Sequence, residues 1–309
     1  MTGAVLTAGE TMALLDPHGD LAYGGSLTLR MAGAESNVAI ALARLGVPAR
    51  WISRVGADPM GDVILQALAR EGVDVGLVGR EPDAPTGLFY KARVGGVTEV
   101  RYYRAGSAAT RLRAGDAPDA AFDGVALVHL TAITMAISPT ARDFVIDVAR
   151  RARDRGLTVL FDPNWRPALW ESPAAASAAC AEVLPYADWV LCGADEGRLL
   201  FGAETPAATI AAIRAGGAGD AVVRVGAGGA VVLAGGEPTT VPPERVVDVV
   251  DEVGAGDAFA AGFAFGLLRG DEPAEAVRTA HRLAAAALEG TGDWETLPFL
   301  ADLEPEIAG

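Results

Sequence analysis

The chain has 309 residues, of which 51% are hydrophobic, so it can bury a large core. Its formal net charge of −15 excludes a general nucleic-acid-binding protein, because phosphate backbones are bound by clustered Lys and Arg. The first residues show no basic segment followed by a long apolar one, so we expect no signal peptide and a cytoplasmic protein without membrane partners. Cys180 and Cys192 lack metal-ligand spacing, which predicts two reduced structural thiols.

Short β-branched runs alternate with helical stretches rich in Ala, Leu and Arg. In chain order, residues 36–45 predict a helix, 50–55 a strand and 62–71 a second helix. The further predicted strands are 125–130, 158–161, 189–192 and 221–225, and the further helices are 140–155 and 174–184. This alternation predicts an α/β fold with a doubly wound, mostly parallel sheet covered on both faces, and a single domain over 1–309.

Two early segments, 21–31 and 86–103, break this pattern by alternating apolar and polar residues. Each contains a glycine pair that suits a tight turn, so they predict antiparallel hairpins with one exposed face. We expect a small β-sheet lid over about 10–31 and 86–106, projecting from the larger sheet. Unpaired strand edges on such a lid predict a homodimer formed through it. The glycine pairs are Gly24-Gly25 and Gly95-Gly96.

The run DEVGAGDAFAAGF starts at Asp251, after an apolar stretch at 247–250 that predicts a strand, and leads into a helix near Ala258. Glycines at a helix start leave backbone N–H groups free to bind an anion, which the helix dipole also favours. The carboxylate of Asp257 could accept a hydroxyl proton there while the amides hold phosphate charge. Phosphoryl transfer requires these two elements, together with a metal ion that bridges the phosphates.

Two common phosphate-binding loops are excluded for this run. A dinucleotide-binding fingerprint needs a third glycine where Phe259 stands. A Walker A loop needs Gly-Lys-Ser/Thr, and the only lysine, Lys91, follows Tyr90. Taken alone, the segment also fits an ordinary turn whose aspartate caps a helix in solvent.

Three segments together resemble the signatures of the PfkB (ribokinase-like) carbohydrate kinase family. They are AGAESNVAIALARLG at 32–46, SRVGADPMGDVILQALAREGVDV at 53–75 and the DEVGAGDAFAAGF run, and the resemblance extends over about 5–296. It implies a ribokinase-like fold and an enzyme that uses ATP and Mg2+. By the same resemblance, Asp257 is the base, and the amides of Gly254, Ala255 and Gly256 form the anion hole.

The resemblance also assigns residues to the two substrates. Gly33 and Asn37 match positions that hold sugar hydroxyls, although the residues alone equally predict that Asn37 caps a helix. Glu196 matches a residue that acts on Mg2+ through water. The nucleotide-side positions are Arg224, Gly226, Gly229, Gly254, Gly256, His281 and Asp293. The departures from the family pattern are Glu252 in place of Thr, Gly193 in place of Asn and Arg224 in place of Lys.

Within the family, VRYYRAGSAA, HLTAITMAIS and FDPNWRPALW resemble the kinases of 2-keto-3-deoxygluconate, a sugar acid. Tyr102 and Arg104 share a strand face, and Arg166 follows a strand end where ligands of α/β sheets gather. Two arginines suit a carboxylate, because each presents a fork of donors to two oxygens. Phe89 stands where the subgroup tends to have tyrosine, which leaves the galactonate epimer open. The implied substrate-binding residues are Gly33, Asn37, Phe89, Tyr102, Arg104, Ile133, Arg166 and Asp257.

The sequence therefore predicts transfer of the ATP γ-phosphate to the terminal hydroxyl of 2-keto-3-deoxygluconate, giving the 6-phosphate. One alternative is a fructokinase-like or ribokinase-like kinase of a neutral sugar. Another is a sugar-binding relative without activity, which the three departures favour and the intact GAGD disfavours. A nicotinamide oxidoreductase on the same kind of sheet lacks its fingerprint loop.

Overall fold

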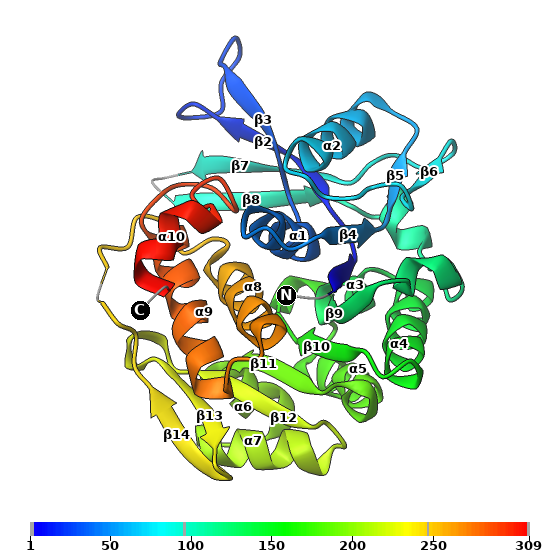
Figure 1. Ribbon diagram of the computed structural model, residues 1–309. Coiled ribbons are helices and arrows are strands. Elements are labelled where there is room, and N and C mark those ends of the chain that lie inside the picture. The colour runs from blue at the N-terminus through cyan, green and yellow to red at the C-terminus, as the bar shows by residue number, and fades with distance from the viewer. Residues whose placement is uncertain (1–2, 95–96, 246, 308–309) are drawn as a thin grey trace.

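The computed structural model describes residues 3–94, 97–245 and 247–307, and it is built on one large sheet (Figure 1). The sheet has eight strands in the order β14-β13-β12-β11-β10-β9-β1-β4. The six strands from β12 to β4 are parallel, and β13 and β14 complete one edge as an antiparallel pair. The strands are β1 (Ala4–Ala8), β4 (Ala49–Ile52), β9 (Val125–Thr131), β10 (Thr158–Asp162), β11 (Trp189–Gly193), β12 (Asp220–Arg224), β13 (Ala230–Ala234) and β14 (Glu237–Val241).

Helices cover both faces of this sheet, which confirms the predicted doubly wound fold. Buried side chains of α1, α8 and α9 form the core on one face, and those of α4, α5 and α7 form the core on the other. Several helices begin with a Ser, Thr or Asp cap followed by proline, which fixes their start. The helices are α1 (Ala34–Arg44), α2 (Pro59–Arg70), α3 (Ala132–Ile137), α4 (Pro139–Asp154), α5 (Pro173–Val183), α6 (Ala194–Phe201), α7 (Pro206–Ala215), α8 (Ala255–Arg269), α9 (Pro273–Leu288) and α10 (Leu300–Ile307).

A second sheet of four strands stands apart from the main sheet, at the top of Figure 1, and we call it the lid. Its order is β3-β2-β7-β8, and the hairpin predicted at 86–103 is present as β7 and β8. The hairpin predicted at 21–31 is displaced: β3 pairs with β2, which starts at Met12, and residues 21–26 form no strand. The two hairpins join through a parallel pairing of β2 with β7. The turn predicted at Gly95-Gly96 lies outside the described residues. The lid strands are β2 (Met12–Pro17), β3 (Leu27–Ala32), β7 (Leu88–Val94) and β8 (Val97–Tyr103).

Two of the sequence predictions for single strands are wrong. The segment predicted as one strand at 50–55 breaks at Ser53, and its second half forms β5 (Arg54–Gly56), which pairs with β6 (Gly79–Glu81) in a separate small sheet. The apolar stretch at 247–250 forms no strand: Val249 and Val250 are more than half exposed, and the Val250 amide donates to the Leu288 carbonyl at the end of α9. Among the described residues, no helix is long and apolar enough to cross a membrane.

Candidate active site

Asp257 lies in the first turn of α8, because this helix begins at Ala255 rather than near Ala258. Gly254 precedes the helix with a φ of 78°, in the left-handed region that glycine tolerates. A Cβ atom at Gly254 would lie 2.1 Å from the Asp293 carbonyl oxygen, so a larger residue cannot fit. The first amides of a helix have no acceptor within it, and the Ala255 amide makes only a long hydrogen bond of 3.5 Å to the Glu252 carbonyl. The amides of this turn can therefore bind an anion.

Both carboxylate oxygens of Asp257 are held by side-chain amides. Asn37 Nδ2 donates to Oδ2 at 2.8 Å, and Asn164 Nδ2 donates to Oδ1 at 3.2 Å. Gly33, not Asn37, is the N-cap of α1, so the capping interpretation of Asn37 is wrong. Burial raises the pKa of Asp257, while the Asn37 hydrogen bond and the charge of Arg166 oppose that rise. The side chain is therefore fixed in place and more basic than an ordinary aspartate.

Asn164 is a site residue that the sequence reasoning missed. Its backbone has a φ of 43°, which asparagine tolerates better than most side chains, and its amide donates to Asp162 Oδ1 at 2.8 Å. Burial raises the pKa of Asp162 to about 7, although Arg224 opposes that rise. The sequence held one signal for this residue: in the FDPNWR segment, an asparagine follows the end of strand β10 by two residues, where ligands of α/β sheets gather. This turn directs the Asn164 side chain at Asp257.

The two arginines predicted to hold a carboxylate differ in their surroundings. Arg166 is exposed, forms no ion pair within the described ranges and lies close enough to Asp257 to lower its pKa. Arg104 instead pairs with Glu10, whose side chain is fully buried. The structure therefore gives the site one unpaired arginine and one arginine that already has an acidic partner.

The lid presents the other predicted sugar contacts. Phe89 stacks on Tyr102 with ring centroids 5.4 Å apart, and the Arg104 guanidinium also lies 5.4 Å from the Tyr102 ring centre. Tyr90 stacks on Tyr103 instead, which confirms that it faces the opposite side of the strand from Phe89. Ile133 is half-buried at the start of α3. An aromatic wall with a cationic end therefore belongs to the lid.

Glu35, next to the predicted sugar-binding residues, is a second carboxyl that the sequence reasoning missed. It is fully buried on α1, and its Oε1 accepts hydrogen bonds from Thr131 Oγ1 at 2.7 Å and Thr134 Oγ1 at 2.6 Å. Burial raises its pKa to about 7, against the effect of these two hydroxyls. A Cβ atom at Gly9 would lie 2.2 Å from the Glu35 carboxyl, so this glycine provides its space.

Arg224 lies among carboxylates on the predicted nucleotide side. Its Nη2 is 3.6 Å from Asp162 Oδ1 and 3.5 Å from Glu196 Oε2. Glu196 also accepts from the backbone amides of Trp165 at 2.6 Å and Gly193 at 2.5 Å, so both of its oxygens have protein partners. Within the described ranges, no three His, Cys, Asp or Glu side chains form a cluster that could hold a metal ion. Any ion here would keep most of its water ligands, as Mg2+ commonly does.

The remaining nucleotide-side residues surround α8 and the loop between β12 and β13. Gly226 and Gly229 have φ values of 60° and 95°, and a Cβ atom at Gly229 would meet the Val241 carbonyl at 2.2 Å. His281 contacts the same carbonyl at 3.1 Å and lines a cavity of about 390 Å³ with α9 and α10. Burial raises the pKa of Asp293 to about 7, while Lys91 on the lid opposes that rise.

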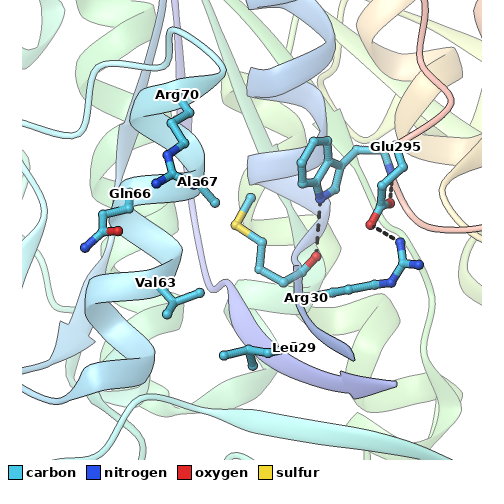
Figure 2. A pocket seen from close by; sticks show the side chains of 9 residues that line it. Leu29, Arg30, Val63, Gln66, Ala67, Arg70 and Glu295 are labelled. Atoms are coloured by element: carbon cyan, nitrogen blue, oxygen red, sulfur yellow. Dashed lines mark hydrogen bonds and ion pairs between the residues drawn. The ribbon is translucent and has the colours of Figure 1, made fainter. Parts of the chain in front are cut away.

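Residues 293–295 connect the turn before α8 to the lid, and we call them the bridging segment. Arg30 Nη1 of β3 donates to Glu295 Oε1 at 2.6 Å, and Trp294 Nε1 donates to the Met31 carbonyl at 3.3 Å (Figure 2). A cavity of about 350 Å³ lies between these contacts and α2 (Figure 2). The other end of the segment is the Asp293 carbonyl that faces Gly254.

Comparison with known proteins gives consistent matches over almost the whole chain. The model of the pfkB family carbohydrate kinases matches residues 5–299. The 2-dehydro-3-deoxygluconokinase of Bacillus subtilis (strain 168) is 39% identical over 297 residues, covering 95% of this chain and 92% of the relative. The 2-dehydro-3-deoxygalactonokinase of Haloferax volcanii is 35% identical, covering 94% and 92%.

Solved structures agree with this picture. A PfkB protein from Polaromonas sp. JS666 superposes with a TM-score of 0.87 at 36% identity, covering 98% of this chain and 99% of that one. A fructokinase with bound ATP from Xylella fastidiosa gives a TM-score of 0.86 at 26% identity and covers both chains fully, at 100% each. The overall fold is thus shared with proteins of this family over almost the whole chain.

Proposed function

The chain belongs to the pfkB family of carbohydrate kinases and is an ATP-dependent kinase, and we propose that its acceptor is 2-keto-3-deoxygluconate. This sugar acid is the 2-dehydro-3-deoxygluconate in the name of the Bacillus subtilis relative. The observation that carries the proposal is the exposed, unpaired Arg166 close to the buried Asp257. The product would be the 6-phosphate.

An arginine beside the base suits a substrate that carries its own carboxylate. The guanidinium of Arg166 forms no ion pair among the described residues, so it can pair with a ligand carboxylate through two parallel hydrogen bonds. Arg104 approaches from the lid and supplies a second donor. With Tyr102 and Phe89 beside it, the acid end of the sugar would lie under the lid and the terminal hydroxyl would point to Asp257.

The phosphoryl transfer then requires one base and one site for negative charge. Asp257 accepts the proton of the terminal hydroxyl as the hydroxyl oxygen attacks the γ-phosphorus of ATP. The bond between the γ-phosphorus and the β–γ bridging oxygen breaks, and its electrons stay with ADP. The amides at Gly254, Ala255 and Gly256 hold the charge on the transferred phosphoryl group. Asn37 and Asn164 keep the Asp257 carboxylate oriented throughout.

On the nucleotide side, Arg224 lies beside the start of α8, where its Nη1 donates to the Gly256 carbonyl at 3.4 Å. We place the phosphates between Arg224 and the start of α8, beside Gly226 and Gly229. His281 and Asp293 would then lie near the adenine of ATP and close the site. Mg2+ supplies charge neutralisation between the β- and γ-phosphates when it is bound. The unpartnered, buried Asp162 Oδ2 and the nearby Glu196 suit an ion held through water.

The test is Mg2+-dependent ATP consumption with 2-keto-3-deoxygluconate, its galactonate epimer, fructose and ribose. We expect the two sugar acids to be preferred, with a higher kcat/KM for one of them. Arg166→Gln should then raise the KM for the acids by about 10- to 100-fold and leave the neutral sugars unchanged. Arg198→Gln, which removes an exposed arginine on α6, is the matched control.

The pairing of Arg104 with Glu10 is the observation that favours a neutral sugar instead. It places a buried negative charge behind one of the two arginines and reduces the need for an acidic ligand there. Preference for fructose or ribose in the same panel would retain Asp257 as the base and reject the carboxylate contacts. No turnover with any of these sugars, with binding still measurable, would support a relative without activity.

We also propose that the lid mediates a homodimer. Seven of the twelve large hydrophobic side chains that are exposed in the described part of the chain lie in the lid segments, including Leu27, Leu29 and Tyr103. The strands β3 and β8 are the open edges of the lid sheet. Sedimentation at micromolar concentration should show a dimer, and a monomer alone would contradict this proposal.

A further inference from the structure

Glu10 is a buried acid that lies where the lid leaves the main sheet. It follows β1 and precedes β2, and its side chain is fully shielded from solvent. Two glycines make room around it: a Cβ atom at Gly87 would lie 3.0 Å from its Oε1, and one at Gly33 would lie 2.3 Å from its carbonyl oxygen. The position is therefore built for this side chain and offers a ligand no access to it.

Both oxygens of the Glu10 carboxylate are occupied by residues that follow the last lid strand. Its Oε2 accepts from Arg104 Nε at 2.9 Å and also from Arg104 Nη2. Its Oε1 accepts from Ser107 Oγ at 3.0 Å. A buried carboxylate whose two oxygens both accept from this one segment holds the segment in a single position.

This arrangement determines which edge of Arg104 is available. A guanidinium has five N–H donors, and the Nε–Nη2 edge of Arg104 is turned toward Glu10. The Tyr102 ring lies 5.4 Å from the guanidinium carbon and covers one of its faces. Nη1 has no protein partner among the described residues, so the end bearing Nη1 is the part left for a substrate.

We propose that Glu10 is a positioning residue for substrate selection: it locks Arg104 so that only its Nη1 end reaches the carboxylate of the sugar acid. The inference rests on the proposed function, because it requires that Arg104 contacts that carboxylate. Glu10 itself touches neither substrate nor the reacting atoms. Its effect should therefore appear in the binding of the acid and not in the chemical step.

The test is a double-mutant cycle with Glu10→Gln and Arg104→Ala, measured with 2-keto-3-deoxygluconate and ATP. Glu10→Gln should raise the KM for the acid about tenfold, keep kcat within about twofold and leave the KM for ATP unchanged. Adding Glu10→Gln to Arg104→Ala should cause no further change, because Glu10 acts only through Arg104. Ser107→Ala, a milder loss of one hydrogen bond to Glu10, should shift the KM in the same direction by about two- to threefold.

The matched control is Asp147→Asn on α4. Asp147 lies 3.4 Å from Arg151, and the two side chains are as shielded as Arg104, with 14% and 15% exposure against 15%. This control should leave the KM for the acid unchanged. If the two substitutions raise the KM additively, or if Glu10→Gln lowers the KM, the positioning role of Glu10 is rejected while the Arg104 contact is retained. An unchanged KM in Arg104→Ala would instead reject the proposed carboxylate contact, and the role of Glu10 with it.

Discussion

The floor of the site and the lid above it are built in different ways. The floor is buried and internally bonded: Asp257 is 8% exposed, and Asn37 and Asn164 hold its two oxygens. The lid is much more open, since Tyr102 is 48% exposed and its stacking partner Phe89 belongs to a small cluster of four buried residues. The side chain proposed for chemistry thus lies inside the core, whereas part of the aromatic surface proposed for selection is open to solvent.

This difference separates the chemical step from the choice of acceptor. A preorganised carboxylate and free amides at a helix start serve any sugar hydroxyl, whatever the rest of the sugar carries. The names of the compared proteins give different acceptors, while a fructokinase superposes on this chain over its whole length. Substitutions in the floor should therefore change kcat, and substitutions in the lid should change KM for one class of sugar.

The largest effect is expected for Asp257→Asn in the floor. Loss of the base should lower kcat about a thousandfold, with the KM for the sugar within a few-fold of the unsubstituted value. Steady-state ATP consumption measures both constants. Asp154→Asn, which neutralises an exposed carboxylate at the end of α4, should leave both unchanged. Turnover of Asp257→Asn at the unsubstituted rate would reject the mechanism.

The next effect concerns the free energy of unfolding, which should depend on pH because the buried carboxyl of Glu35 has a raised pKa. Glu35 has a pKa of about 7 in the fold against an ordinary value of 4.5, so between these pH values the folded chain holds a proton that the unfolded chain has released. Its contribution to stability is complete below pH 4.5 and is lost as the pH rises through 7. Relative to Glu35→Gln, the unsubstituted chain should lose about 3 kcal/mol between pH 5 and 8.

Urea unfolding of both proteins across that range gives this difference directly. Subtracting the two curves removes the contributions of Asp162 and Asp293, whose pKa values are also raised to about 7. Glu237→Gln, at an exposed position of β14, should give a difference that does not vary with pH. A pH-independent difference for Glu35→Gln as well would show that the buried carboxyl stays charged in the fold.

The smallest effect is expected for Phe89→Tyr in the lid. Restoring the hydroxyl that the subgroup tends to have should lower the KM for the preferred sugar acid about threefold and leave kcat unchanged, since one neutral hydrogen bond contributes about 1 kcal/mol. Tyr90→Phe, on the opposite face of β7, is the matched control and should change neither constant. Equal effects on fructose and on the acids would show that Phe89 does not distinguish them.

Much of the main sheet could be predicted because strands and helices leave periodic local signals. The strands β9, β10 and β11 lie where the apolar runs indicate, within one residue at either end. The stretch at 247–250 has the same composition as a strand but lies in contact with the end of α9, and nothing local distinguishes the two outcomes. Whether an apolar run joins a sheet depends on the neighbours that the fold supplies.

In the candidate site as well, local motifs could be predicted from the sequence, and contacts between distant residues could not. Asp257 and Gly254 lie in a contiguous motif, so the sequence predicts them directly. Glu10 and Arg104 are 94 positions apart and Asn37 and Asp257 are 220 apart, so their contacts exist only once the chain is folded. For that reason the sequence predicts that Arg104 contacts a substrate carboxylate but does not indicate its pairing with Glu10, which the structure shows.

The bridging segment at 293–295 gives the site a thermodynamic property. One end abuts Gly254 at the turn before α8, and the other is tied to Arg30 and Met31 of the lid. If the sugar draws the lid inward, the same displacement reaches the turn proposed to bind the phosphates of ATP. Linkage then requires reciprocity: whatever factor the sugar adds to the affinity for ATP, ATP must add to the affinity for the sugar.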